Sequence, residues 1–108
     1  MRIYFLIAIC LPLLAFSNKR EINLFDGKTL TGWTDRQGGE PSDGWVVEDG
    51  CILRKSKASN LYSKETFKDF EFSCEWKIAA GTNSGIKYRV ADYSGEILGP
   101  EYQIIDDA

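Results

Sequence analysis

The stretch Trp45-Val46-Val47-Glu48-Asp49-Gly50-Cys51-Ile52-Leu53 decides the fold class, because two short apolar runs flank a two-residue turn signal. An Asp-Gly pair favours a type I′ turn, in which both central residues take a positive φ. A turn of this type joins neighbouring antiparallel strands. The stretch therefore predicts a β-hairpin over residues 45–53.

A second strand signal is the alternation from Phe70 to Ile78, where apolar and polar residues exchange at every step. This period of two predicts a strand with one buried face, and it places Trp76 in the core. The run 86–90 alternates in the same way and puts Lys87 and Arg89 on one face. A shorter apolar strand is predicted over residues 102–105.

Turn signals containing glycine separate these runs, and no helical periodicity of useful length is present. They are Asp26-Gly27, Gly38-Gly39, the segment 81–85, Ser94-Gly95 and Gly99-Pro100. Residues 63–70 fit either one turn of helix or the entry to the following strand. The polar, glycine-rich loop 34–44 is expected to be exposed and mobile. Short strands divided by such turns predict an all-β sandwich or barrel.

The first seventeen residues predict a secretory signal peptide, which leaves residues 18–108 as the folded part. Arg2 gives a positive start, residues 3–16 are almost all apolar, and Ala15-Phe16-Ser17 offers small residues for cleavage. The apolar run is shorter than the ~20 residues of a membrane span. An uncleaved anchor is an alternative, and a lipoprotein modified at Cys10 is disfavoured by the bulky Ile9 before it. We expect a secreted or periplasmic protein without stable membrane insertion after cleavage.

Composition argues against several classes of function. The net charge is −3 with both signs mixed along the chain, and the lack of a basic stripe argues against nucleic acid as a partner. The chain has no histidine, the commonest general base and metal ligand. Cys51 and Cys74 could pair in an exported protein, or they could be buried as small apolar residues on strands, which is the interpretation we favour. Neither has a CxxC partner, so a structural zinc site is not expected.

The stretch Leu24-Phe25-Asp26-Gly27-Lys28-Thr29-Leu30-Thr31-Gly32-Trp33 resembles the opening signature of the 3-keto-disaccharide hydrolase family, formerly catalogued as a domain of unknown function. Later landmarks follow in the family's order: residues 45–50, 67–72, 83–86, Arg89 and 101–106. The resemblance implies a concanavalin-like jelly-roll β-sandwich. A complete domain of the family is longer, so residues 18–108 are expected to be the N-terminal part of such a domain.

The family's activity, as the resemblance implies it, is hydrolysis of the glycosidic bond of 3-keto-disaccharides or 3-keto-glycosides. The C3 ketone acidifies the C2 proton, a carboxylate removes that proton, and an arginine or a metal stabilises the enolate. Elimination followed by hydration would then cleave the bond. The cofactor is unknown, with a divalent metal as one option. The competing interpretations are a non-catalytic, lectin-like carbohydrate-binding module and an inactive fragment.

Residue chemistry suggests the catalytic candidates. Glu101 and Asp106 are candidate bases, and Arg89 is the candidate electrophilic support. Asp106 falls near the end of a predicted strand, where an Asx turn is the structural alternative. For Arg89 and Glu101 the alternative is a solvent-exposed charge without a catalytic role, since charged side chains on strands are usually solvated.

The candidate substrate-binding residues are Asn83, Lys87 and Gln103, whose amide and ammonium groups can bind sugar hydroxyls. Asn83-Ser84-Gly85 is predicted to be either a site loop or a plain turn between strands. Trp33 and Trp45 could stack on sugar rings, although packing is the commoner role of sandwich tryptophans.

Overall fold

The computed structural model describes residues 19–106, so the predicted signal peptide and Asp107 lie outside the described residues. The chain divides into two compact units, the first ending at Phe67 and the second beginning at Lys68. Every regular element between residues 19 and 106 is a β-strand, which confirms the all-β prediction. The strands form four antiparallel pairs, two in each unit.

The first unit contains two antiparallel ladders. Strand β1 (Trp33–Thr34) pairs with β4 (Tyr62–Ser63), and β2 (Trp45–Glu48) pairs with β3 (Cys51–Arg54). The hairpin predicted from the Asp-Gly pair is confirmed, because Asp49 and Gly50 take φ values of 51° and 72°. Positive φ at both positions is what a type I′ turn needs. After Ser63 the chain forms neither of the alternatives considered for residues 63–70, since it enters no helix and no strand there.

The two tryptophans of the first unit are half-buried and bonded to backbone. The indole N–H of Trp33 donates to the carbonyl oxygen of Leu24 at 2.8 Å, and that of Trp45 donates to the carbonyl oxygen of Ser59 at 2.7 Å. These bonds tie each loop to a strand. The arrangement supports the packing role for Trp33 and Trp45 over sugar stacking.

Asp26 organises the opening motif of the first unit. Its Oδ1 accepts the backbone N–H groups of Lys28 and Thr29 at 2.8 and 2.7 Å, and its Oδ2 accepts the Thr29 hydroxyl at 2.7 Å. The Thr29 hydroxyl bond, followed by the two backbone bonds, lowers the pKa of Asp26 from 3.8 to about 2. The carboxylate is therefore charged at neutral pH, and it is this charged form that holds the bend at Gly27.

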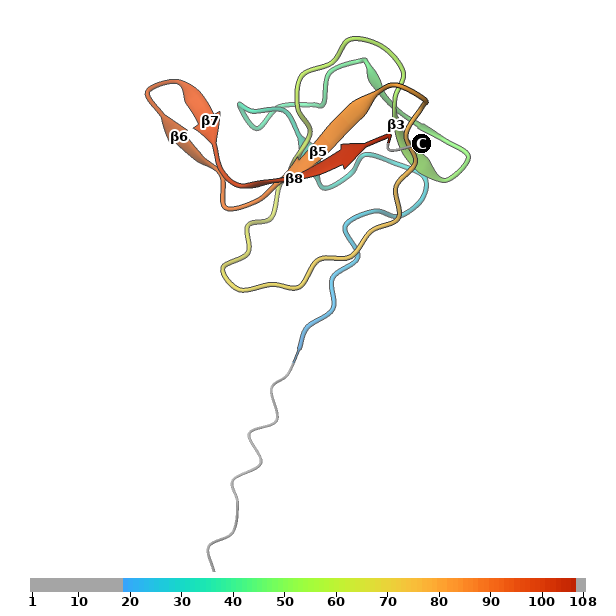
Figure 1. Ribbon diagram of the computed structural model, residues 1–108. Coiled ribbons are helices and arrows are strands. Elements are labelled where there is room, and N and C mark those ends of the chain that lie inside the picture. Colours follow the sequence, from blue (N-terminus) through green and yellow to red (C-terminus); the bar gives the residue numbers. More distant parts are fainter. Residues whose placement is uncertain (1–18, 107–108) are drawn as a thin grey trace, which may run out of the picture. The chain divides into compact units, whose positions relative to one another are not determined.

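The second unit contains a hairpin nested inside a longer ladder. Strand β5 (Asn83–Lys87) pairs with β8 (Glu101–Ile105), and β6 (Ala91–Tyr93) pairs with β7 (Glu96–Leu98) (Figure 1). Ser94 and Gly95 take φ values of 54° and 91°, so the predicted Ser-Gly turn is confirmed. Ile104 on β8 is the one buried hydrophobic side chain among residues 19–106, with 7% of its surface exposed.

The two ladders of the second unit are out of register by one residue. The Tyr88 N–H donates to the carbonyl oxygen of Pro100 at 3.1 Å, which extends the β5–β8 ladder by one bond. Beyond it Ala91 lies opposite Leu98, so the two residues 89 and 90 face the single residue 99. Two residues opposite one define a β-bulge.

The bulge overturns the prediction that alternation continues from residue 86 to residue 90. Strand β5 ends at Lys87, and Arg89 takes a φ of 50°, which turns it out of the strand alternation. Pro100 supplies the physical reason. It has no N–H to return the bond from Tyr88, so the ladder stops at this point.

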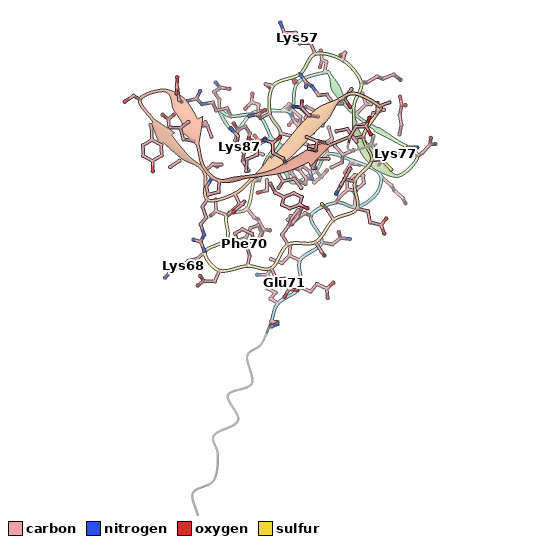
Figure 2. All side chains as sticks on the ribbon, in the orientation of Figure 1. Lys57, Lys68, Phe70, Glu71, Lys77 and Lys87 are labelled. Atoms are coloured by element: carbon pink, nitrogen blue, oxygen red, sulfur yellow. The ribbon has the colours of Figure 1, made fainter. Side chains whose placement is uncertain are left out.

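The prediction of a strand from Phe70 to Ile78 is wrong for this structure. The segment forms no strand, and Phe72 and Trp76 are 45% and 52% exposed, so Trp76 is not in a core. Period-two alternation says which side chains share a face, but a strand also needs a neighbour for its backbone groups. No other segment of residues 19–106 forms a ladder with this one. Figure 2 labels Phe70, Glu71 and Lys77 along it.

The cysteine interpretation is corrected in the same way. Cys51 and Cys74 are both exposed and both carry free thiols, so neither is a buried apolar residue. Cys51 is on β3 as predicted, whereas Cys74 lies in the segment 70–78, which forms no strand.

Candidate functional site

The β5–β8 ladder brings four of the six sequence-predicted site residues onto one face. Side chains on one face of an antiparallel pair come from directly opposed residues and from positions two apart. We call this surface the polar face, and its opposed pairs are Asn83 with Ile105, Gly85 with Gln103, and Lys87 with Glu101. The other face carries Ser84, Ile86, Tyr102 and Ile104.

Asn83-Ser84-Gly85 is neither a loop nor a turn, which corrects both sequence-based interpretations. All three residues belong to β5, and the turn lies just before them, where the Thr82 N–H donates to the Ala79 carbonyl oxygen at 3.1 Å. Asn and Gly are frequent in turns for local reasons, so their presence misplaced the turn. The strand places the Asn83 side chain on the polar face.

A carboxylate and an ammonium group face each other at one end of the polar face. The Lys87 Nζ lies 3.9 Å from Glu101 Oε2, and the two side chains are 37% and 32% exposed. Figure 2 labels Lys87 on β5. A pair this long and this accessible stabilises the fold by about 0–1 kcal/mol. The ion pair itself therefore does not hold either group in place, and both groups are accessible to a ligand.

Glu101 bends across the polar face toward Gly85, its diagonal neighbour. A Cβ built on Gly85 would lie 2.7 Å from the Glu101 Cδ and 2.8 Å from its Cγ. The space above the glycine is thus filled by the carboxylate arm. The sequence did not single out Gly85 on its own, because its diagonal position to Glu101 follows only from the register of the ladder.

Asp106 has a structural role at the opposite end of the ladder. Its Oδ2 accepts the Gly81 N–H at 2.7 Å, and its own N–H donates to the Thr82 carbonyl oxygen at 3.3 Å. Glu101 opens β8 and Asp106 follows its end, so the two are separated by roughly 17 Å along the strand. They are therefore alternatives for a catalytic base rather than a working pair.

Arg89 stands outside the ladder, at the bulge. Its Nη2 lies 3.9 Å from Asp69 Oδ1, and both side chains are exposed. The strand alternation that put Arg89 on the face of Lys87 stops before it, and a bulge cannot be read from one sequence. Within residues 19–106, no three His, Cys, Asp or Glu side chains gather as metal ligands would. No helix long and apolar enough to cross a membrane occurs in the same range.

Comparison with known proteins gives a family match and a match to a curated relative. The family described as "3-keto-alpha-glucoside-1,2-lyase-like domain" matches residues 20–108. A curated relative named 3-keto-disaccharide hydrolase, from Bacteroides thetaiotaomicron, is 32% identical to this chain and aligns with 80% of it. The chain spans 37% of that relative's length.

Proposed function

The chain belongs to the 3-keto-alpha-glucoside-1,2-lyase-like domain family, and from that premise we propose that the full-length protein cleaves the glycosidic bond of 3-keto-disaccharides or 3-keto-glycosides. The name of the relative supports this substrate class. The observation that carries the proposal is the polar face of β5–β8, where Glu101 lies beside Lys87 with two amide side chains on the same surface.

The proposed reaction begins with a proton transfer. Glu101 takes the C2 proton of the sugar, and the electron pair of that C–H bond moves toward the C3 ketone to give an enolate. The enolate then re-forms the ketone, a C1–C2 double bond forms, and the C1–O bond breaks. The leaving oxygen takes up a proton. This first half is a 1,2-elimination, the reaction that a lyase performs.

Hydration completes the cleavage. Water adds its hydroxyl to C1 and a proton to C2, so the sum of both halves is hydrolysis of the glycosidic bond. The two halves reconcile the word lyase in the family description with the word hydrolase in the relative's name. The route differs from ordinary glycoside hydrolysis, in which two carboxylates flank the anomeric carbon.

The remaining residues receive supporting roles. Arg89 stabilises the enolate oxygen, since its long and exposed contact with Asp69 leaves the guanidinium able to turn toward a ligand. Lys87 is the cation next to the base, and Asn83 and Gln103 bind sugar hydroxyls. Asp106 is the weaker candidate base, because its carboxylate already accepts the Gly81 N–H.

The finer fold and the location are part of the same proposal. We propose a concanavalin-like jelly-roll sandwich, of which residues 18–108 form the N-terminal part, in a secreted or periplasmic protein. Antiparallel ladders throughout the described residues and the family match support the fold. The share of the relative that the chain spans supports the partial domain.

Isotope labelling tests the mechanism directly. The full-length protein is incubated in D₂O with a 3-keto-disaccharide and, separately, with the unoxidised disaccharide, each with and without a divalent metal. We expect cleavage of the keto sugar alone, with one deuterium at C2 of the released 3-keto sugar. A no-enzyme reaction corrects for spontaneous exchange beside the ketone. Cleavage without deuterium at C2 contradicts the elimination route.

The Glu101→Gln variant serves as the matched control. It keeps the shape of the side chain but removes the base, so turnover should fall by about 10²–10⁴-fold while substrate binding is retained. If the unaltered protein binds the keto sugar but never cleaves it under any metal condition, the carbohydrate-binding module replaces the enzyme as the function.

A further inference from the structure

We infer that Gly85 is a positioning residue that fixes where the Glu101 carboxylate lies on the polar face. The inference rests on the proposed role of Glu101 as base. Gly85 occupies the central rung of the β5–β8 ladder, opposite Gln103, and the Lys87–Glu101 rung is the next one on the same face. The site therefore has a gap at its middle, and Glu101 reaches diagonally into that gap.

Backbone conformation does not explain the glycine. Gly85 lies in a regular strand and is not among the glycines with positive φ, so an L side chain could adopt the same backbone. A glycine in a strand interior normally weakens the strand and marks a close approach by another group. That group is identified here, because the three nearest atoms to a Cβ at this position all belong to Glu101.

The identity of the obstructing atoms predicts what a substitution would do. They are the terminal oxygen, the Cδ and the Cγ of a flexible side chain, and none belongs to the backbone. An alanine at position 85 would thus be accommodated when the Glu101 arm swings away, and the ladder would survive. The change displaces the carboxylate and leaves the strand in place, which separates positioning from folding.

Contacts in the unaltered full-length protein provide the first test. NMR on a selectively labelled sample should show nuclear Overhauser contacts between the Glu101 γ protons and the Gly85 α protons. The same contacts should vanish in Gly85→Ala, while cross-strand contacts between opposed residues of the ladder persist. Their absence from the unaltered protein overturns the inference, whatever the enzyme does.

Kinetics provide the second test, through a double-mutant cycle on the keto sugar. Gly85→Ala should lower kcat by about tenfold or more and leave the KM within about threefold. In the Glu101→Gln background the same substitution should change kcat less than about twofold, because the group it displaces no longer acts. Ser84→Ala, on the opposite face of the same strand, is the control and should keep the activity of the unaltered protein.

The outcomes separate the two proposals. If Gly85→Ala keeps full activity while Glu101→Gln loses most of its turnover, positioning by Gly85 is contradicted. It is also contradicted if the losses of kcat from the two substitutions are additive in the double mutant. Full activity of Glu101→Gln instead refutes Glu101 as the base, and the contact measurements then decide alone whether Gly85 sets the place of that side chain.

Discussion

The Asp106 carboxylate accepts a hydrogen bond from the Gly81 N–H at 2.7 Å, and this bond closes the open end of the β5–β8 ladder. Gly81 lies in the turn that precedes β5, and Asp106 directly follows β8, so the bond joins the end of β8 to the turn that leads into β5. Asp106 therefore contributes to stability, which distinguishes it from Glu101.

The first prediction follows from this difference. In the full-length protein, Asp106→Ala should lower the free energy of unfolding by about 1–3 kcal/mol, because it removes the carboxylate that accepts the hydrogen bond from the Gly81 N–H. Turnover at temperatures well below unfolding should change little. Glu101→Gln should show the reverse pattern. Urea unfolding and steady-state kinetics on Asp106→Ala and Glu101→Gln check this prediction. A large loss of turnover in the isosteric variant Asp106→Asn would show instead that Asp106 is the catalytic base.

The second prediction concerns Arg89 and its contact with Asp69. The contact is 3.9 Å long and exposed, so Asp69→Ala should change stability by less than about 0.5 kcal/mol and leave turnover intact. Arg89→Met should lower turnover by about 10²-fold, the usual effect of losing one group that stabilises an oxyanion. Equal losses in the two variants would mean that the ion pair, and not the free guanidinium, matters.

The third prediction concerns the turn of the β6–β7 hairpin. Ser94 adopts a φ of 54°, a conformation that Asn and Gly adopt more readily than Ser. Ser94→Asn should therefore stabilise the protein by roughly 0.5 kcal/mol. Gly95→Ala, at a φ of 91°, should destabilise it by about 1 kcal/mol or more. Thermal unfolding of both variants measures the difference, and stabilisation by Gly95→Ala would contradict the turn geometry.

The fourth prediction is a pH dependence that comes from Asp26. Its folded pKa of about 2 lies below the ordinary 3.8, so its contribution to stability is fully present above pH 3.8. That contribution is lost as the pH falls toward 2, because the unfolded chain binds the proton first. Asp26→Asn should flatten the stability profile between these values. Unfolding measured at pH 5, 3.5 and 2.5 tests this, and identical slopes for both proteins would rule out the linkage.

The fifth prediction concerns the solubility of residues 18–108 expressed alone. The segment 70–78 exposes Phe72 and Trp76 without a ladder partner among the described residues, which favours association between chains. We expect poor solubility or partial folding. Trp76→Ser should raise the soluble yield, whereas Lys77→Ser should not. A monodisperse monomer with a cooperative thermal transition would contradict the prediction.

Local signals in the sequence predicted local structure well. The Asp49-Gly50 hairpin and the Ser94-Gly95 turn follow from backbone preferences of two adjacent residues, and both are present. Strand 102–105 was also found, one residue longer at its start. These features depend on few residues, so a single sequence contains what is needed to find them.

Features that depend on partners were harder to predict. Residues 70–78 have the alternating pattern that is typical of a strand, but the pattern does not show whether a neighbouring strand is present to pair with them. Pro100 stops the ladder opposite Tyr88, and this moved Arg89 off the face that alternation assigned to it. Four candidate site residues still came together, because Asn83, Lys87, Glu101 and Gln103 have the parity that the ladder register requires.

The nested arrangement of the second unit also has a kinetic consequence. The β6–β7 hairpin lies in sequence between β5 and β8, so its closure shortens the effective loop that separates the two outer strands. A hairpin of this size forms in about 1–10 μs, and ladders between more distant segments generally follow. The rate at which Lys87 and Glu101 first meet is then governed by a turn that contains neither of them.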